Sequence, residues 1–151
     1  MTASFKIEGL REIDSILAVL PKATSKGVVR RALAKELKPV AAMANQLWPG
    51  SDERAFAVSA TLQRGQRAPE IGPNAVRMFV GSTRSAPHAH LLEWGTAPRY
   101  HKSGKFVGAT PPTPSLTPAW EAHRGDIIEG LAATLRRELE ATMARKAKRR
   151  R

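Results

Sequence analysis

Three histidines and a glutamate lie within a short central stretch of the chain, and these residue types bind metal ions. They are His88, His90, His101 and Glu93. Neutral imidazole is a good ligand for zinc or nickel, so the four side chains could in principle converge on one ion. Their spacing follows no fixed ligand pattern, and residues of a loop need not share a face. We therefore expect no metal site, and we interpret the histidines as exposed or hydrogen-bonded groups near a subunit contact.

Glu93 is the only acidic residue between Glu70 and Glu121, and its sequence neighbourhood is basic. A carboxylate that acts as a general acid or base commonly works with a second titratable group, and no partner carboxylate is nearby in the sequence. The sequence therefore predicts a structural role for Glu93, either in an ion pair or as an acceptor for nearby backbone donors.

Other catalytic patterns are missing from the sequence. It contains no Gly-x-Ser-x-Gly elbow and neither type of glycine-rich phosphate-binding loop. It also contains no cysteine, which excludes disulfides and thiol catalysis and is typical of a protein that folds in a reducing cytoplasm. We expect a protein that is not an enzyme and that uses no cofactor or metal.

A basic run at the end of the sequence is a second candidate site. The formal net charge is +12, and residues 136–151 hold eight basic and two acidic residues, which is half of the excess. Such a run neutralises phosphates and binds nucleic acid without sequence preference. The alternatives are an acidic partner surface or a solvated terminus, because stacking aromatics and DNA-reading motifs are absent. The candidate contacts are Arg145, Lys146, Lys148, Arg149, Arg150 and Arg151.

Length and composition predict a single small domain that gains stability from neighbours. The sequence has 151 residues, of which 42% are hydrophobic and only 5% aromatic. We expect one domain at residues 1–143, followed by the basic tail at 144–151. Because the aromatic content is low, the core is expected to be modest and completed by oligomerisation. The start lacks the features of a signal peptide, and no stretch is apolar enough to span a membrane, so we expect no membrane contact.

Helical spacing predicts two helices in the first third of the chain. After a short strand at residues 5–7, apolar residues recur every three or four positions between Leu10 and Leu20, and Pro21 ends this helix. A longer amphipathic helix is expected from about Thr24 to Leu47. Pro39 lies inside it and should kink it or divide it in two, because proline lacks an amide proton and clashes with the preceding turn.

Alternating patterns predict two strands, at residues 56–62 and 75–81, which pair as an antiparallel ribbon. Residues 90–94 fit either a helical turn or a strand, and Gly95 allows a sharp change of direction there. The basic segment 97–114 is expected to lack regular structure.

A last helix is predicted around Pro118, with Thr117 as its cap. Its apolar spacing continues to Leu139, after which residues 143–151 either extend the helix or fray. The fold class is therefore α+β: a small antiparallel sheet packed against the long, Pro39-containing helix and the C-terminal helix, in two layers.

Two motifs carry a family resemblance. The first is His90-Leu-Leu-Glu-Trp-Gly-Thr96 and the second is Pro114-Ser-Leu-Thr-Pro-Ala119. They resemble the signature of the tail-completion or neck family of long-tailed bacteriophages, where an acidic residue, an aromatic residue and Gly-Thr precede a Pro-x-Leu-x-Pro-Ala motif that opens the last helix. The chain departs from this pattern at Ser115, where the family commonly has an aromatic residue, and around residues 49–51.

The resemblance implies a structural protein of the virion that acts in head–tail joining and is assembled in the bacterial host cytoplasm. It implies a homo-oligomeric ring, with a hexamer favoured, next to other neck, head-closure, portal or tail-tube proteins. Within such a ring, the structural hub and subunit contact would be formed by Glu93, Trp94, Gly95, Thr96, Pro114 and Pro118.

Two functions from different classes follow from the sequence. One is the ring-forming junction protein, in which Trp48, Trp94 and Trp120 are core or interface anchors. The alternative is a protein that binds nucleic acid without sequence preference through its basic C-terminal tail, with affinity that falls steeply as salt rises.

Overall fold

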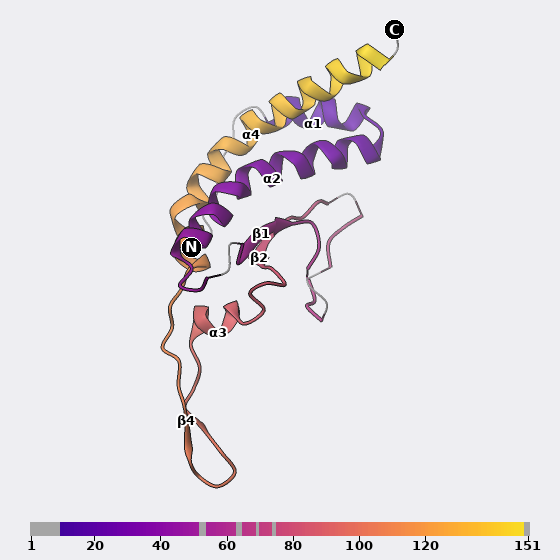
Figure 1. The fold of residues 1–151 in the computed structure, drawn as a ribbon. Helices are drawn as coiled ribbons and strands as arrows, with labels where there is room; N and C mark the ends of the chain where they lie inside the picture. The colour runs from indigo at the N-terminus through magenta and orange to yellow at the C-terminus, as the bar shows by residue number, and fades with distance from the viewer. Residues whose placement is uncertain (1–9, 52–53, 63–64, 69, 74, 150–151) are drawn as a thin grey trace. The chain divides into compact units, whose positions relative to one another are not determined.

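The computed structural model describes residues 10–51, 54–62, 65–68, 70–73 and 75–149. The predicted strand at residues 5–7 lies outside this part of the chain. The elements in chain order are α1 (Leu10–Val19), α2 (Lys22–Leu47), β1 (Phe56–Ser59), β2 (Phe79–Ser82), α3 (Ala89–Trp94), β3 (Arg99–Tyr100), β4 (Phe106–Gly108) and α4 (Leu116–Arg149) (Figure 1). β1 pairs with β2 and β3 pairs with β4. Two small antiparallel sheets and two long helices make the fold α+β, as predicted.

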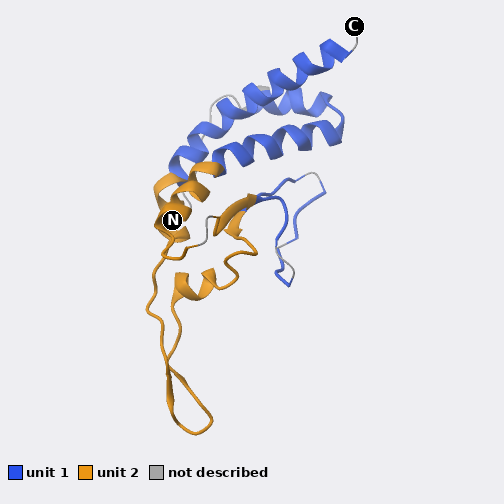
Figure 2. Ribbon diagram, viewed as in Figure 1, with its two compact units in different colours: residues 1–37, 59–79, 124–151 blue, residues 38–58, 80–123 orange. Residues whose placement is uncertain are grey.

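The chain divides into two compact units, which are described separately (Figure 2). Unit 1 comprises residues 1–37, 59–79 and 124–151, and unit 2 comprises residues 38–58 and 80–123. Charge is divided unequally between them. Unit 1 has 19 lysine and arginine residues against 9 aspartate and glutamate residues, whereas unit 2 has 6 against 4. Nearly all of the positive excess therefore belongs to unit 1.

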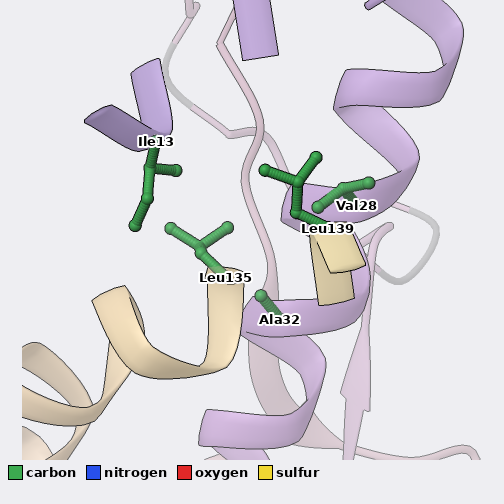
Figure 3. Packing of buried hydrophobic residues seen from close by; sticks show 5 residues of the cluster. All are labelled: Ile13, Val28, Ala32, Leu135 and Leu139. Carbon is green, nitrogen blue, oxygen red and sulfur yellow. The ribbon is translucent and has the colours of Figure 1, made fainter. Parts of the chain in front are cut away.

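Unit 1 is built on a small apolar cluster shared by three helices. Ile13 of α1, Val28 and Ala32 of α2, and Leu135 and Leu139 of α4 are buried together. Figure 3 shows the two leucines directed toward the side chains of α1 and α2. Residues four positions apart lie on one face of a helix, so each helix contributes one apolar stripe to the cluster. Burying such stripes is the main favourable contribution to packing of this unit.

Charged contacts fix the register of α2 and α4 in unit 1. Thr134 donates to the Glu36 carboxylate at 2.5 Å, and further along α4 Glu138 accepts from Arg31 at 2.9 Å. Higher numbers on α4 thus meet lower numbers on α2, so the two helices run antiparallel here. Glu138 is buried and forms ion pairs with both Arg31 and Lys35. Hydrogen bonds from Lys35 and Arg31 lower its pKa despite burial, which keeps the carboxylate charged.

Unit 2 joins the end of α2 to the sheet formed by β1 and β2. Trp48 is buried and meets the ring of Phe56 edge-on, with 5.5 Å between ring centroids. The Asn45 side chain accepts from the Phe56 amide at 2.8 Å and donates to the Phe56 carbonyl at 2.9 Å. Just outside the paired strands, the Thr83 amide donates to the Ala55 carbonyl, so residues that follow β2 meet residues that precede β1. This order is that of an antiparallel pair, as expected.

Pro39 does not divide α2, so that alternative is wrong. The helix is continuous from Lys22 to Leu47 with Pro39 inside it. Pro39 is exposed, so the carbonyl that loses its amide partner can be hydrated, while buried Val40 and Ala44 hold the next turns in place.

The strands are shorter than expected. β1 ends at Ser59 instead of continuing to residue 62, because the Ser59 hydroxyl bonds to the backbone of Thr61 and turns the chain. β2 begins at Phe79, not at residue 75, and it ends at Ser82.

α4 differs from the prediction at its start. It begins at Leu116, so Thr117 lies inside the first turn and is not the cap. At the other end the helix continues to Arg149. Of the two alternatives predicted for this segment, residues 143–149 therefore extend the helix and do not fray. Among the described helices, including this long one, none combines the length and apolar character needed to cross a membrane.

Candidate subunit-contact site

The Glu93 carboxylate caps α4 from a distance. Glu93 lies at the end of α3, and its Oε2 accepts the amides of Ser115 at 2.8 Å and Leu116 at 3.0 Å. Its Oε1 accepts the amide of Thr117 at 2.6 Å. The first amides of a helix have no partner within the helix, and a negative charge there is favourable. Glu93 therefore joins the two sequence motifs through backbone hydrogen bonds, the second of the two roles expected for it.

The same contacts control the pKa of Glu93. Burial raises this pKa, but hydrogen bonds from the Thr117 side chain and from the amides of Ser115, Leu116 and Thr117 lower it by more. The net shift is downward, so the carboxylate stays charged at neutral pH. A general acid would need the opposite shift, which leaves Glu93 suited to capping and not to proton donation.

Gly95 makes the turn that leads away from α3. Its φ is +71° and its ψ is 179°, a backbone conformation that is essentially restricted to glycine. A Cβ at this position would lie 2.8 Å from the Thr110 carbonyl oxygen and 2.9 Å from the Pro112 nitrogen. Both neighbours are backbone atoms, which cannot move aside easily. Conformation and space thus both require glycine here.

Thr96 closes the base of the segment that follows. Its amide donates to the Thr110 carbonyl, and its hydroxyl accepts the Thr110 amide, both at 2.9 Å. The Thr113 amide also donates to the Leu92 carbonyl at 2.6 Å. These bonds hold the outgoing and returning chains together next to the motif.

The basic segment 97–114 contains regular structure, so the expectation of an irregular loop is wrong. β3 and β4 form an antiparallel hairpin in which Tyr100 lies opposite Phe106, with a register shift between Arg99 and Tyr100. The two rings meet edge-on with centroids 5.5 Å apart. The aromatic pair across the strands and the hydrogen bonds around Thr96 stabilise this hairpin. Its strands are too short to show an alternating apolar and polar pattern in the sequence.

Large apolar side chains are exposed around this hairpin. The exposed fractions are 77% for Trp94, 65% for Tyr100 and 56% for Phe106, and Val107 is similarly exposed. Trp120 is also exposed, so of the three tryptophans only Trp48 is a core residue. Exposed aromatic residues on one segment are typical of surfaces that contact another protein.

Ser115 connects the ends of the two long helices within unit 2. It is buried, its hydroxyl donates to the Leu47 carbonyl at 3.2 Å, and its amide binds Glu93. Pro114 directly precedes it and is exposed, while Pro118 occupies the third position of α4, where a missing amide proton costs little. The small size of Ser115 thus has a local structural reason, because the side chain is buried between its partners Leu47 and Glu93.

The histidines considered as metal ligands take separate roles. His88 packs against Trp48, with 5.7 Å between ring centroids, and His90 Nδ1 lies 3.1 Å from the Pro87 carbonyl. His101 Nδ1 lies 3.1 Å from the Ser103 hydroxyl. Within the described part of the chain, no three His, Asp or Glu side chains come together as a metal-binding group.

Four of the six basic residues predicted as contacts lie in the last turns of α4, and they are exposed: Arg145, Lys146, Lys148 and Arg149. Arg150 and Arg151 lie outside the described residues. Arg145, the first basic residue of the tail, also donates to the Thr142 hydroxyl one turn earlier on α4, at 3.1 Å.

Sequence reasoning missed Ser115, Asn45, Arg31 and Thr142 as contact-making residues. Three of them are short polar side chains at helix ends or on helix faces, and their partners are distant in sequence. Only Asn45 could have been found from the sequence. It lies near the end of an apolar helical stripe, and a polar side chain on a buried face requires hydrogen-bond partners.

No family model, curated protein or solved structure matches the chain.

Proposed function

We propose that this chain is a non-enzymatic structural protein of a bacteriophage head–tail junction, a tail-completion or neck protein that assembles into a ring. The observation that carries the proposal is the Glu93 cap, which binds the amides of residues 115–117 and so joins the two motifs of the family resemblance. The motifs act together to place a hairpin and the last helix, which is a structural task.

The exposed aromatic surface supports assembly. We define this surface as Trp94, Tyr100, Phe106 and Val107, all in unit 2 and all exposed in the single chain. Aromatic side chains are enriched among residues that dominate protein–protein binding, and desolvating them is favourable. A contact between unlike surfaces of identical subunits closes into a ring when the rotation permits.

The proposal is tested by replacing two residues of the aromatic surface. The variant Trp94→Ser with Phe106→Ser is compared with the native chain by light scattering coupled to size exclusion, and by rescue of particles that lack the gene. Because the replaced side chains are exposed, we expect the fold to persist while ring formation or entry into particles is lost.

The matched control is Val19→Ser, which removes an exposed apolar side chain from unit 1. It should assemble like the native chain. A native chain that stays monomeric at all concentrations and never enters particles would overturn the proposed function. Equal assembly by the native chain, the double variant and the control would show that the aromatic surface is not the subunit contact.

A second candidate function is nucleic-acid binding without sequence preference. The observation that favours it is the continuation of α4 to Arg149, which exposes Lys146, Lys148 and Arg149 on a helical scaffold. Binding to a duplex of arbitrary sequence is measured across a salt series. Affinity that falls steeply with salt supports this function, since phosphate contacts release counterions, and an absence of binding at low salt removes it.

A further inference from the structure

Two arginines from different helices of unit 1 donate to one hydroxyl oxygen. Arg31 Nη2 on α2 lies 2.9 Å from Thr142 Oγ1, and Arg145 Nη2 on α4 lies 3.1 Å from the same atom. The Thr142 hydroxyl gives its own proton to the Glu138 carbonyl at 2.8 Å. Having donated one proton and accepted two, this hydroxyl has used its full hydrogen-bonding capacity. It therefore holds two positive guanidinium groups close together.

Positive charge exceeds negative charge at this cluster. The single Glu138 carboxylate pairs with both Arg31 and Lys35, and Arg145 adds a third cation through Thr142. The contacts described for Arg31 use its Nε and one proton of Nη2, out of five N–H donors. Its side chain is 44% exposed, so a ligand in solution can reach the remaining donors. Like charges held together favour the binding of a shared anion.

The cluster lies beside the basic end of α4, to which Arg145 belongs. A Cβ added at Gly27 would lie 3.4 Å from Arg31 Nη1, so the guanidinium lies next to this residue of α2. The antiparallel arrangement places this part of α2 beside the C-terminal turns of α4. The cluster therefore continues into the exposed basic residues Lys146, Lys148 and Arg149.

We propose that Arg31 and Arg145 form a phosphate-binding site for a nucleic-acid backbone, shared between α2 and α4 and extended by the end of α4. The inference rests on the second candidate function and assigns to it Arg31, which is far from the basic tail in sequence but shares the Thr142 hydroxyl with Arg145. The planar guanidinium fork matches the geometry of a phosphate. On the described α4 residues from 124 onward, Met143 is the only exposed large apolar side chain. A polar, strongly positive surface is typical of nucleic-acid contacts, whereas protein interfaces need apolar anchors.

The test compares single variants in binding a short DNA duplex of arbitrary sequence over a salt series. We expect Arg31→Gln and Arg145→Gln each to weaken binding about tenfold at low salt and to reduce the salt slope by about 0.9, the loss of one phosphate contact. Arg31→Lys keeps the charge but loses the fork, so it should weaken binding with little change of slope. The matched control is Lys35→Gln, which removes one charge and one Glu138 partner without touching Thr142. It should bind within about twofold of the native chain.

The possible outcomes separate this inference from the function on which it rests. Equal losses for Lys35→Gln and Arg31→Gln would mean that only total charge matters, and would overturn the site. Unchanged DNA binding by Arg31→Gln would also overturn the site, but it would leave the DNA-binding role of the basic tail intact. Arg145→Gln keeps the comparison with Lys35→Gln available if Arg31→Gln fails to fold, because Arg145 forms no described contact with the Glu138 carboxylate. If the native chain fails to bind DNA, the second candidate function itself is removed. If the native chain binds poly-glutamate as tightly as it binds DNA, the ligand of the site is a carboxylate and not a phosphate, which also overturns the inference.

Discussion

Glu93 is a carboxylate that binds backbone amides, and this use explains its position among basic residues. Three amides at the start of α4 converge on its two oxygens. Such hydrogen bonds are stronger than those between neutral groups, and they complement the positive end of the helix dipole. Neither a metal nor a substrate is required to account for an acidic residue at this position.

We predict that Glu93→Gln destabilises the fold at pH 7 by about 1–2 kcal/mol, because an amide oxygen is a weaker acceptor for these donors. The folded-state pKa of Glu93 lies below its unfolded value. Its stabilising contribution is therefore fully present above the unfolded pKa and is lost as pH falls through the folded pKa. The stability difference between native and variant chains should shrink from pH 7 toward pH 3.

Urea unfolding at both pH values measures this difference. Glu138 also has a lowered pKa, but it is present in both proteins, so its effect cancels in the comparison. A difference that stays constant across the pH range would show that the charge of Glu93 does not stabilise the fold.

Among the elements, the long helices could be predicted from sequence and the hairpin could not. Buried apolar residues recur at multiples of four positions, as at Val28, Ala32, Val40 and Ala44 on α2 and at Ile127, Leu135 and Leu139 on α4, and this helical spacing can be read from the sequence. β3 and β4 have two and three residues, too few for any alternation to be read. They exist because Thr96 and Thr110 close their base and because two aromatic rings meet across the strands.

For the candidate site, the sequence indicated the important residues but not their partners. Its residues Glu93 and Gly95 stand out by type, since one is an isolated acidic residue and the other a glycine directly after a tryptophan. The partners of Glu93 lie more than twenty positions away, at 115–117, and no local pattern reveals such a contact. The exposure of Trp94 was equally hidden, because tryptophan is usually buried and only tertiary structure decides the case.

The turn between α3 and the hairpin gives a prediction for an element. Gly95→Val should destabilise unit 2 by about 1–3 kcal/mol, because it forces a β-branched residue into a glycine conformation and places its Cβ against the backbone of Thr110 and Pro112. The matched control is Gly104→Val in the hairpin turn, where φ is +82° but nothing lies within 4 Å of the added Cβ. Thermal melting should show a smaller loss for the control, and a melting curve unchanged by Gly95→Val would contradict the proposed strain.

At the scale of the whole molecule, charge and exposed aromatic surface belong to different units. Unit 1 carries 19 basic residues against 9 acidic residues, and unit 2 carries the aromatic surface of Trp94, Tyr100, Phe106 and Val107. Electrostatic contacts weaken with salt, whereas burial of apolar side chains does not depend on counterions. On the two proposed functions, the subunit contact and the nucleic-acid contact would therefore use different residues.

This division predicts that the basic tail can be removed without loss of fold or assembly. The described residues from Ala144 to Arg149 are exposed, and the apolar cluster of unit 1 ends at Leu139. Deletion of residues 144–151 should therefore leave ring formation unchanged and shift the free energy of unfolding by less than about 1 kcal/mol. Binding to duplex DNA should become several-fold weaker and less dependent on salt, since the deletion removes phosphate contacts. Light scattering and a salt series on the same preparation measure both properties, and loss of assembly on deletion would show that the two units do not act independently.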